Sequence, residues 1–247
     1  MADDSADQPP TDEFAVPPLL DAVEIGVRAP WGRIYGPTSV IVPAGGVTVL
    51  QGSEGRGRTA LLLTLAGRMK PSSGTLTAFG HDNDARRIFK RAAIAYINEI
   101  DSIAQGIRVR DVLTEQLRWG SPWCKFVPRA TDDDLERLCR PVFGDLRLPS
   151  LNAVVEELPE LTSALLRIAM ADVRRPELLV VGGVDKLARD ESSDKLMERL
   201  IELGREQTVI TSDVNGAPSF RDRVNVVSVE NLTDDEFVRL DHIEGSC

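Results

Sequence analysis

The sequence is poor in the residues that build disulfides and metal centres. Its 247 residues include three cysteines, Cys124, Cys139 and Cys247, and two histidines, His81 and His242. So few cysteines, so widely separated, predict neither a disulfide framework nor a metal cluster, and they are typical of reduced thiols in a cytoplasmic protein. The two histidines stand alone in the sequence, so no histidine-based metal site is expected.

Long apolar runs and an excess of basic residues are also missing. No stretch of about 18 apolar residues occurs, so no segment is expected to span a membrane. The first residues, MADDSADQPPTDEF, do not resemble a secretory signal. Lys and Arg number 29 against 39 Asp and Glu, a net charge of −10. Because nonspecific nucleic-acid binding needs a positive surface, no nucleic-acid partner is expected.

What is present is an ordinary globular composition, with 42% apolar and 28% charged residues. Residues 1–17 predict a disordered acidic lead-in, and residues 18–247 a single domain. Short runs rich in β-branched residues recur along the chain and predict strands. These runs are Ala22–Val27, Ser39–Val42, Val47–Gln51, Thr75–Phe79, Ile94–Ile97, Leu178–Val181, Thr208–Thr211 and Val224–Val229.

Helix-compatible segments fill the middle of the chain. Residues 84–92 and 190–204 predict single helices, and a helical lobe is expected over about residues 101–172. In this lobe, three acidic residues (132–134) are typical of a helix start. Trp119 and Trp123 are expected in the core, with an exposed patch for a partner's helix as the alternative. Leu178–Val181 is typical of a parallel strand buried on both faces. The sequence therefore predicts an α/β fold with a mostly parallel sheet and an inserted helical lobe.

A glycine-rich segment follows the strand-like run Val47–Gln51. Glycines let a loop curl so that backbone N–H groups meet phosphate oxygens, and a helix start adds positive potential. In the pattern G-x-x-x-x-G-K-[ST], the lysine reaches the β- and γ-phosphates and the hydroxyl binds Mg²⁺. The segment reads Gly52-Ser53-Glu54-Gly55-Arg56-Gly57-Arg58-Thr59 and continues from Ala60 into a helix-forming run.

Arg58 takes the lysine position of this pattern, and Thr59 supplies the hydroxyl. Arginine keeps the charge and can fork onto phosphate oxygens, but its planar group need not reach where a lysine ammonium would lie. ATP is therefore the predicted ligand of Gly52–Ala60, with Mg²⁺ at Thr59 if the nucleotide binds. Hydrolysis of the bound ATP is expected to be impaired. A glycine-rich turn without a ligand is the alternative.

The segment Val47–Gly80 resembles the ATP-binding cassette (ABC) family. The resemblance rests on Ala66-Gly67, Lys70-Pro71, Ser73-Gly74 and Gly80, which match the stretch that follows the phosphate loop in that family. It extends over about residues 20–230. It implies the ABC type of P-loop fold, with a small antiparallel β part beside the parallel sheet.

The other motifs of this family are all changed. Glu99 replaces a glutamine that contacts Mg²⁺ and the attacking water, and Glu160–Ala164 replaces the glycine-rich signature. Gly182 and Gly183 replace the metal-binding aspartate and the general-base glutamate. Asp213 aligns with the switch histidine. Losing a positioned base alone typically costs about 10²–10⁴ in rate, and phosphoryl transfer also needs the metal.

The family has an aromatic residue that stacks on adenine, and its counterpart in this sequence is Trp31 or Tyr35. The resemblance thus implies a cytoplasmic nucleotide-binding subunit that is deficient in ATP hydrolysis. It also implies that this subunit docks on or regulates a transporter-like membrane protein. Dimerisation with itself or with another ABC subunit is implied too. Two alternatives stay open: an active ATPase within a heterodimer, and an interaction module that binds no nucleotide.

Overall fold

The described residues of the computed structural model, 17–97, 106–122 and 126–236, begin with an antiparallel sheet. In it β1 (Leu20–Ala29) lies between β2 (Gly32–Val42) and β4 (Ser73–Ala78), and β5 (His81–Asp82) follows at the edge. This sheet confirms the small antiparallel part that the family resemblance implies. The lead-in up to residue 16, Glu99 and Trp123 lie outside the described residues.

A second sheet, of five strands in the described part of the chain, is parallel throughout. Its order is β6 (Ala92–Ala95), β7 (Leu178–Val181), β8 (Thr208–Asp213), β3 (Val47–Gln51) and β9 (Asn225–Ser228). The carboxyl ends of parallel strands meet at one edge, where α/β proteins bind their ligands. The loops after β3, β7 and β8 therefore converge, and these are the loops that carry the predicted site.

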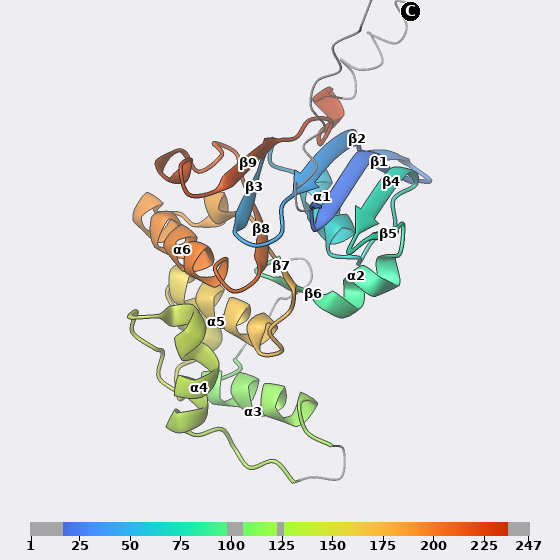
Figure 1. Ribbon diagram of the computed structural model, residues 1–247. Helices are drawn as coiled ribbons and strands as arrows, with labels where there is room; N and C mark the ends of the chain where they lie inside the picture. The colour runs from blue at the N-terminus through green and yellow to red at the C-terminus, as the bar shows by residue number, and fades with distance from the viewer. Residues whose placement is uncertain (1–16, 98–105, 123–125, 237–247) are drawn as a thin grey trace, which may run out of the picture.

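Alternate residues of the parallel strands enter two separate cores, as the period of two along a strand requires. One face turns Val49, Leu179 and Val209 toward the helical lobe. The other turns Leu50 and Ile210 toward α1 (Arg56–Leu65) and the antiparallel sheet. In Figure 1 the antiparallel sheet with α2 (Ala85–Arg91) and the helical lobe lie apart, with the parallel sheet between them.

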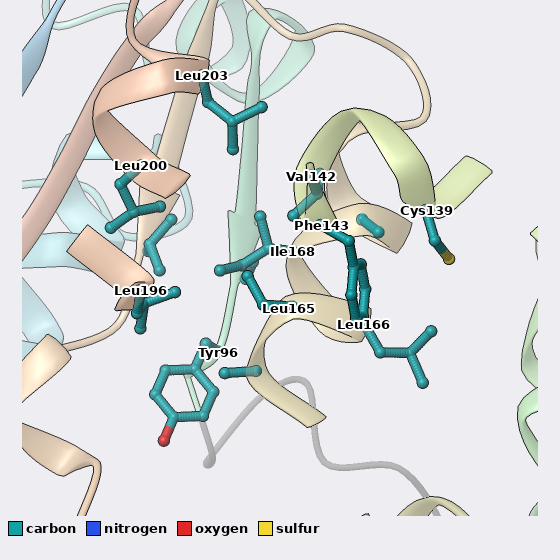
Figure 2. Close-up of a cluster of buried hydrophobic side chains, with 14 of the residues drawn as sticks. Tyr96, Cys139, Val142, Phe143, Leu165, Leu166, Ile168, Leu196, Leu200 and Leu203 are labelled. Carbon is teal, nitrogen blue, oxygen red and sulfur yellow. The ribbon is translucent and has the colours of Figure 1, made fainter. Parts of the chain in front are cut away.

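The lobe consists of α3 (Val109–Trp119), α4 (Asp132–Phe143) and α5 (Glu160–Asp172), and α6 (Asp190–Leu203) packs beside it. Figure 2 shows side chains from three of these helices meeting in one core. Short 3₁₀ turns cover Val155–Glu157 (η1), Val184–Lys186 (η2) and Pro218–Phe220 (η3). The core residues are Cys139, Val142 and Phe143 of α4, Leu165, Leu166 and Ile168 of α5, and Leu196, Leu200 and Leu203 of α6.

Three details differ from the sequence-based expectations. Trp119 is 71% exposed rather than buried in the lobe, because the end of α3 projects beyond the lobe core. The second strand begins at Gly32, not Ser39, since pairing with β1 keeps its glycine- and proline-bearing half extended through several register shifts. Strand β6 begins two residues earlier than expected. No helix among the described residues is long and apolar enough to cross a membrane.

Candidate nucleotide-binding site

The phosphate loop lies between the carboxyl end of β3 and the start of α1, as the pattern predicts. Gly55 caps α1 with φ 152° and ψ −173°, a conformation that only glycine adopts readily. The backbone of Leu232 passes close beside the loop, and a Cβ on Gly57 would lie 2.1 Å from the Leu232 carbonyl oxygen. Both glycines are therefore required, and the loop presents its backbone and the helix start at the sheet edge.

Arg58, at the lysine position of the pattern, is bound to a carboxylate of the same chain. Its side chain is 3% exposed, and its Nη1 and Nη2 lie 2.7 and 3.1 Å from Oδ2 and Oδ1 of Asp185. Nη1 also lies 3.4 Å from the Gly52 carbonyl oxygen. A two-pronged pair of this kind fixes both groups in one plane and is among the stronger charge-assisted contacts. The cation that would meet the phosphates thus already holds an anion.

Asp185 comes from η2, directly after the parallel strand β7. Its Oδ2 also accepts a hydrogen bond from the backbone N–H of Val214 at 3.2 Å, which ties the carboxylate to the loop after β8. The pair therefore joins segments that follow β3, β7 and β8. Sequence reasoning did not single out Asp185, since an aspartate in a short loop carries no signal without its partner.

Gly183 lies beside this pair, and the preceding Gly182 lies against the backbone of Tyr96. The N–H of Gly182 donates to the Ala95 carbonyl oxygen at 2.9 Å, and a Cβ at Gly182 would lie 1.9 Å from the Tyr96 carbonyl oxygen. A Cβ at Gly183 would lie 2.2 Å from Asp185 Oδ1 and 3.2 Å from Arg58 Nη2. As the backbone stands, neither position accepts the carboxylate side chain that the family carries there.

The end of β8 brings Ser212 rather than Asp213 to this space. Asp213 accepts hydrogen bonds from the backbone N–H groups of Asn215 and Ala217, at 2.9 and 2.7 Å, so its carboxylate closes its own loop. The Ser212 hydroxyl is fully buried, has no hydrogen-bond partner in the described structure, and lies 3.2 Å from the Cβ position of Gly183. Alternation along the buried strand is the signal that separates these two neighbours.

The two aromatic candidates have different surroundings. Tyr35 is fully buried, and its hydroxyl donates to Thr64 Oγ1 at 2.8 Å, so it belongs to the core beneath α1. Trp31 is 83% exposed at the turn between β1 and β2, and it borders a cavity of about 590 Å³ together with Gly55 and Gly57. Of the two, only Trp31 can stack on a base held at the loop.

The same cavity is basic in an otherwise acidic molecule. Three arginines, Arg28, Arg33 and Arg56, border it, against one acidic residue, Asp234. The chain as a whole carries a net charge of −10. An aromatic side chain, clustered guanidinium groups and a glycine loop at a helix start together fit an anionic ligand with a planar ring.

Other loop residues have structural partners. The Ser53 hydroxyl donates to Glu236 Oε1 at 2.6 Å, and Ala60 is buried in the first turns of α1. Glu54 and Thr59 border a second cavity of about 390 Å³ with Lys186. The segment Glu160–Ala164 forms the first turn of α5, and Glu160 Oε2 accepts a hydrogen bond from the N–H of Ala188 at 3.0 Å.

The residues present fit a nucleotide better than they fit Mg²⁺. Mg²⁺ in such sites is held by carboxylates and hydroxyls together with phosphates. Thr59 offers one hydroxyl, Gly182 and Gly183 offer no side-chain oxygen, and both oxygens of Asp185 already bind Arg58. Among the residues that the structure describes, no group of three His, Cys, Asp or Glu could hold a metal ion.

Comparisons with known proteins agree with this geometry. The family model of ABC transporters matches residues 35–182. The chain is 25% identical over 199 residues to the daunorubicin/doxorubicin resistance ATP-binding protein DrrA of Streptomyces peucetius, covering 75% of this chain and 55% of that protein. It is 30% identical over 168 residues to the ribose import ATP-binding protein RbsA of Pseudomonas putida, covering 66% and 30%. At most just over half of each relative is thus matched.

Solved structures show the same fold. The structure of cbiO1 from Clostridium perfringens, part of the ABC transporter complex cbiONQ, superposes with a TM-score of 0.65 at 18% identity, covering 93% of this chain and 94% of that one. A putative ABC transporter ATP-binding protein from Pyrococcus furiosus superposes with a TM-score of 0.61 at 18% identity, covering 84% and 96%. The chain belongs to the ABC transporter family, and its fold is that of the nucleotide-binding subunit.

Proposed function

We propose that this chain is a nucleotide-binding ABC subunit that does not turn over ATP and instead serves as a docking or regulatory partner of a membrane protein. The observation that carries the proposal is the Arg58–Asp185 pair, which packs against Gly183 at the position of the general base, while the preceding Gly182 stands at the position of the metal ligand. Phosphoryl transfer depends on positioned charge and metal, and both are displaced here. The cavity at Trp31 supports retained nucleotide binding.

The test measures nucleotide binding and hydrolysis in one purified sample of the full chain. Saturable binding should raise the melting temperature, because a ligand of the folded state stabilises it, while phosphate release stays at the level of a no-protein blank. Turnover that depends on an added ABC subunit and disappears in Arg58→Ala would establish the active alternative. No melting shift at millimolar nucleotide would establish a module that binds none.

A partner surface is proposed on the helical lobe. An apolar cavity of about 510 Å³ lies between α3 and α5, bordered by Val112, Trp119 and Met170. This surface suits a helical segment of a membrane protein at the cytoplasmic face, the partner that subunits of this family have. Trp119→Glu should abolish co-purification of the chain with membranes, whereas Ile41→Glu, at a 56% exposed site on β2, should not. Equal loss in both variants would contradict this assignment.

A further inference from the structure

The cation at the lysine position of the phosphate loop already binds a carboxylate of the same chain. In a phosphate loop, backbone N–H groups hold the phosphates, and the lysine-position cation bridges the β- and γ-phosphates. Here the Nη1 and Nη2 donors of that cation end on Asp185, at 2.7 and 3.1 Å. A carboxylate bound at this point has the charge and the oxygen spacing to satisfy the guanidinium in place of a terminal phosphate.

We infer that the Asp185 carboxylate takes the place of the γ-phosphate, so that the site selects a nucleoside diphosphate over a triphosphate and binds it without a divalent cation. The inference rests on the proposed nucleotide-binding role. A diphosphate still meets the backbone of Gly55–Thr59 and the stacking surface of Trp31. A triphosphate would bring its last phosphate against Asp185, an anion held only 3.2 Å from the N–H of Val214.

The surroundings keep Asp185 in place. The absence of a side chain at Gly183 is what gives the carboxylate room, since an added Cβ would lie 2.2 Å from its Oδ1. Arg58 is 3% exposed and Asp185 15%, so water screens their attraction poorly. Displacing Asp185 would leave the buried charge of Arg58 without its partner. A triphosphate could compensate this charge only after η2 has moved.

The absence of a metal requirement follows from the same residues. In the usual arrangement Mg²⁺ offsets the repulsion between the β- and γ-phosphates and is held by an aspartate after the buried strand. Gly182 occupies that position, with the Tyr96 carbonyl oxygen 1.9 Å from where a Cβ would lie. A bound diphosphate here is neutralised by the loop N–H groups and by the arginines of the cavity.

The experiment is calorimetric titration of the purified full chain with ADP, ATP and AMP, each in Mg²⁺ and in EDTA. We expect ADP to bind at least about tenfold more tightly than ATP, which corresponds to about 1.4 kcal/mol, with an ADP affinity unchanged by EDTA. Tighter or equal binding of ATP in the wild-type chain would overturn the inference. Equal affinities of AMP and ADP would also overturn it, because the pair would then exclude both distal phosphates.

A charge-matched pair of variants isolates the carboxylate. Asp185→Asn keeps the shape but removes the charge, and we expect it to gain at least about tenfold in ATP affinity with little change for ADP. Asp145→Asn changes the net charge equally on the exposed turn after α4 and should keep the wild-type preference. If Asp185→Asn folds and keeps that preference, the inference fails. If it does not fold, the wild-type ADP-to-ATP ratio still decides. Binding of no nucleotide at all would refute the proposed function instead.

Discussion

At Gly182 an added Cβ would meet a backbone oxygen, that of Tyr96, at 1.9 Å, whereas the contact at Gly183 is with a side-chain tip. A backbone atom cannot rotate away as a side chain can, so the chain around Tyr96, directly after β6, would have to move. We expect Gly182→Ala to lower the free energy of unfolding by about 1–3 kcal/mol, the usual cost of overpacking. Urea unfolding of the two proteins measures the difference.

Gly120 offers the matched control for this substitution. It follows α3 with φ −82°, and the nearest atoms to an added Cβ lie 3.7 Å away. Gly120→Ala should therefore change the stability by no more than about 0.5 kcal/mol. Equal stability of Gly182→Ala and wild type would show that the Tyr96 backbone yields freely. An aspartate could then be restored at position 182 without cost.

Arg58 and Asp185 should show strong energetic coupling, because each is the main compensation of the other in a poorly hydrated place. Removing one partner of a buried pair costs about 3–5 kcal/mol, while replacing both by apolar residues is often close to neutral. We expect Arg58→Met and Asp185→Leu each to lower the free energy of unfolding strongly. The double variant should lose at least about 2 kcal/mol less than the sum of the two single losses. Additive effects in denaturant unfolding would mean that the pair contributes nothing as a pair.

At the scale of elements, α4 begins with a reciprocal cap. Thr131 Oγ1 accepts a hydrogen bond from the N–H of Asp134 at 3.3 Å, and Asp134 Oδ2 accepts one from the N–H of Thr131 at 3.0 Å. Thr131→Ala should cost about 1 kcal/mol of stability, since such caps satisfy N–H groups that the helix leaves free. Thermal unfolding measures the loss. Thr75→Ala, at an exposed position of β4, should change little, and a similar loss there would remove the cap as the cause.

The sequence contained enough to predict most of these elements, for physical reasons that differ between them. The buried strand β7 is an unbroken apolar run, and β8 is a buried run rich in β-branched residues. The phosphate loop requires Gly55, whose φ of 152° other residues avoid. Acidic residues indicated the start of α4, although the capping residue itself is Thr131. The strand β5 has two residues and no pattern of its own, so it depends on its partner β4.

The sequence allowed prediction of those features of the site that depend on a single residue, such as a loop glycine or a missing carboxylate. The loss of carboxylates at Gly182 and Gly183 is visible in the sequence, but what fills the space is not. The Arg58–Asp185 pair joins residues separated by 127 positions, and the approach of the Tyr96 backbone to Gly182 depends on how two strands pair. Such contacts follow from the tertiary arrangement, which local sequence does not encode.

On the scale of the whole molecule, the two cores on either side of the parallel sheet each contain a neutral acid. Tyr35 lies in the core beneath α1, and Cys139 lies in the lobe core that Figure 2 shows. Burial raises the pKa of Tyr35 from 10.0 to about 12. Burial likewise raises the pKa of the Cys139 thiol from 9.0 to about 12. Ionising either group would place a charge in an apolar core, away from water.

The direction of the pH dependence follows from these raised pKa values. The folded state favours the protonated forms, so their contribution to stability is complete below about pH 9 and is lost as the pH rises toward 12. Between pH 8 and pH 10.5 we expect the free energy of unfolding to fall by about 2–3 kcal/mol from these two groups together. Urea unfolding at both pH values measures the fall. In the double variant Tyr35→Phe, Cys139→Ala, lower in overall stability, this part of the slope should vanish. A slope unchanged from that of the wild type would mean that other groups cause the alkaline loss and that the two cores tolerate ionisation.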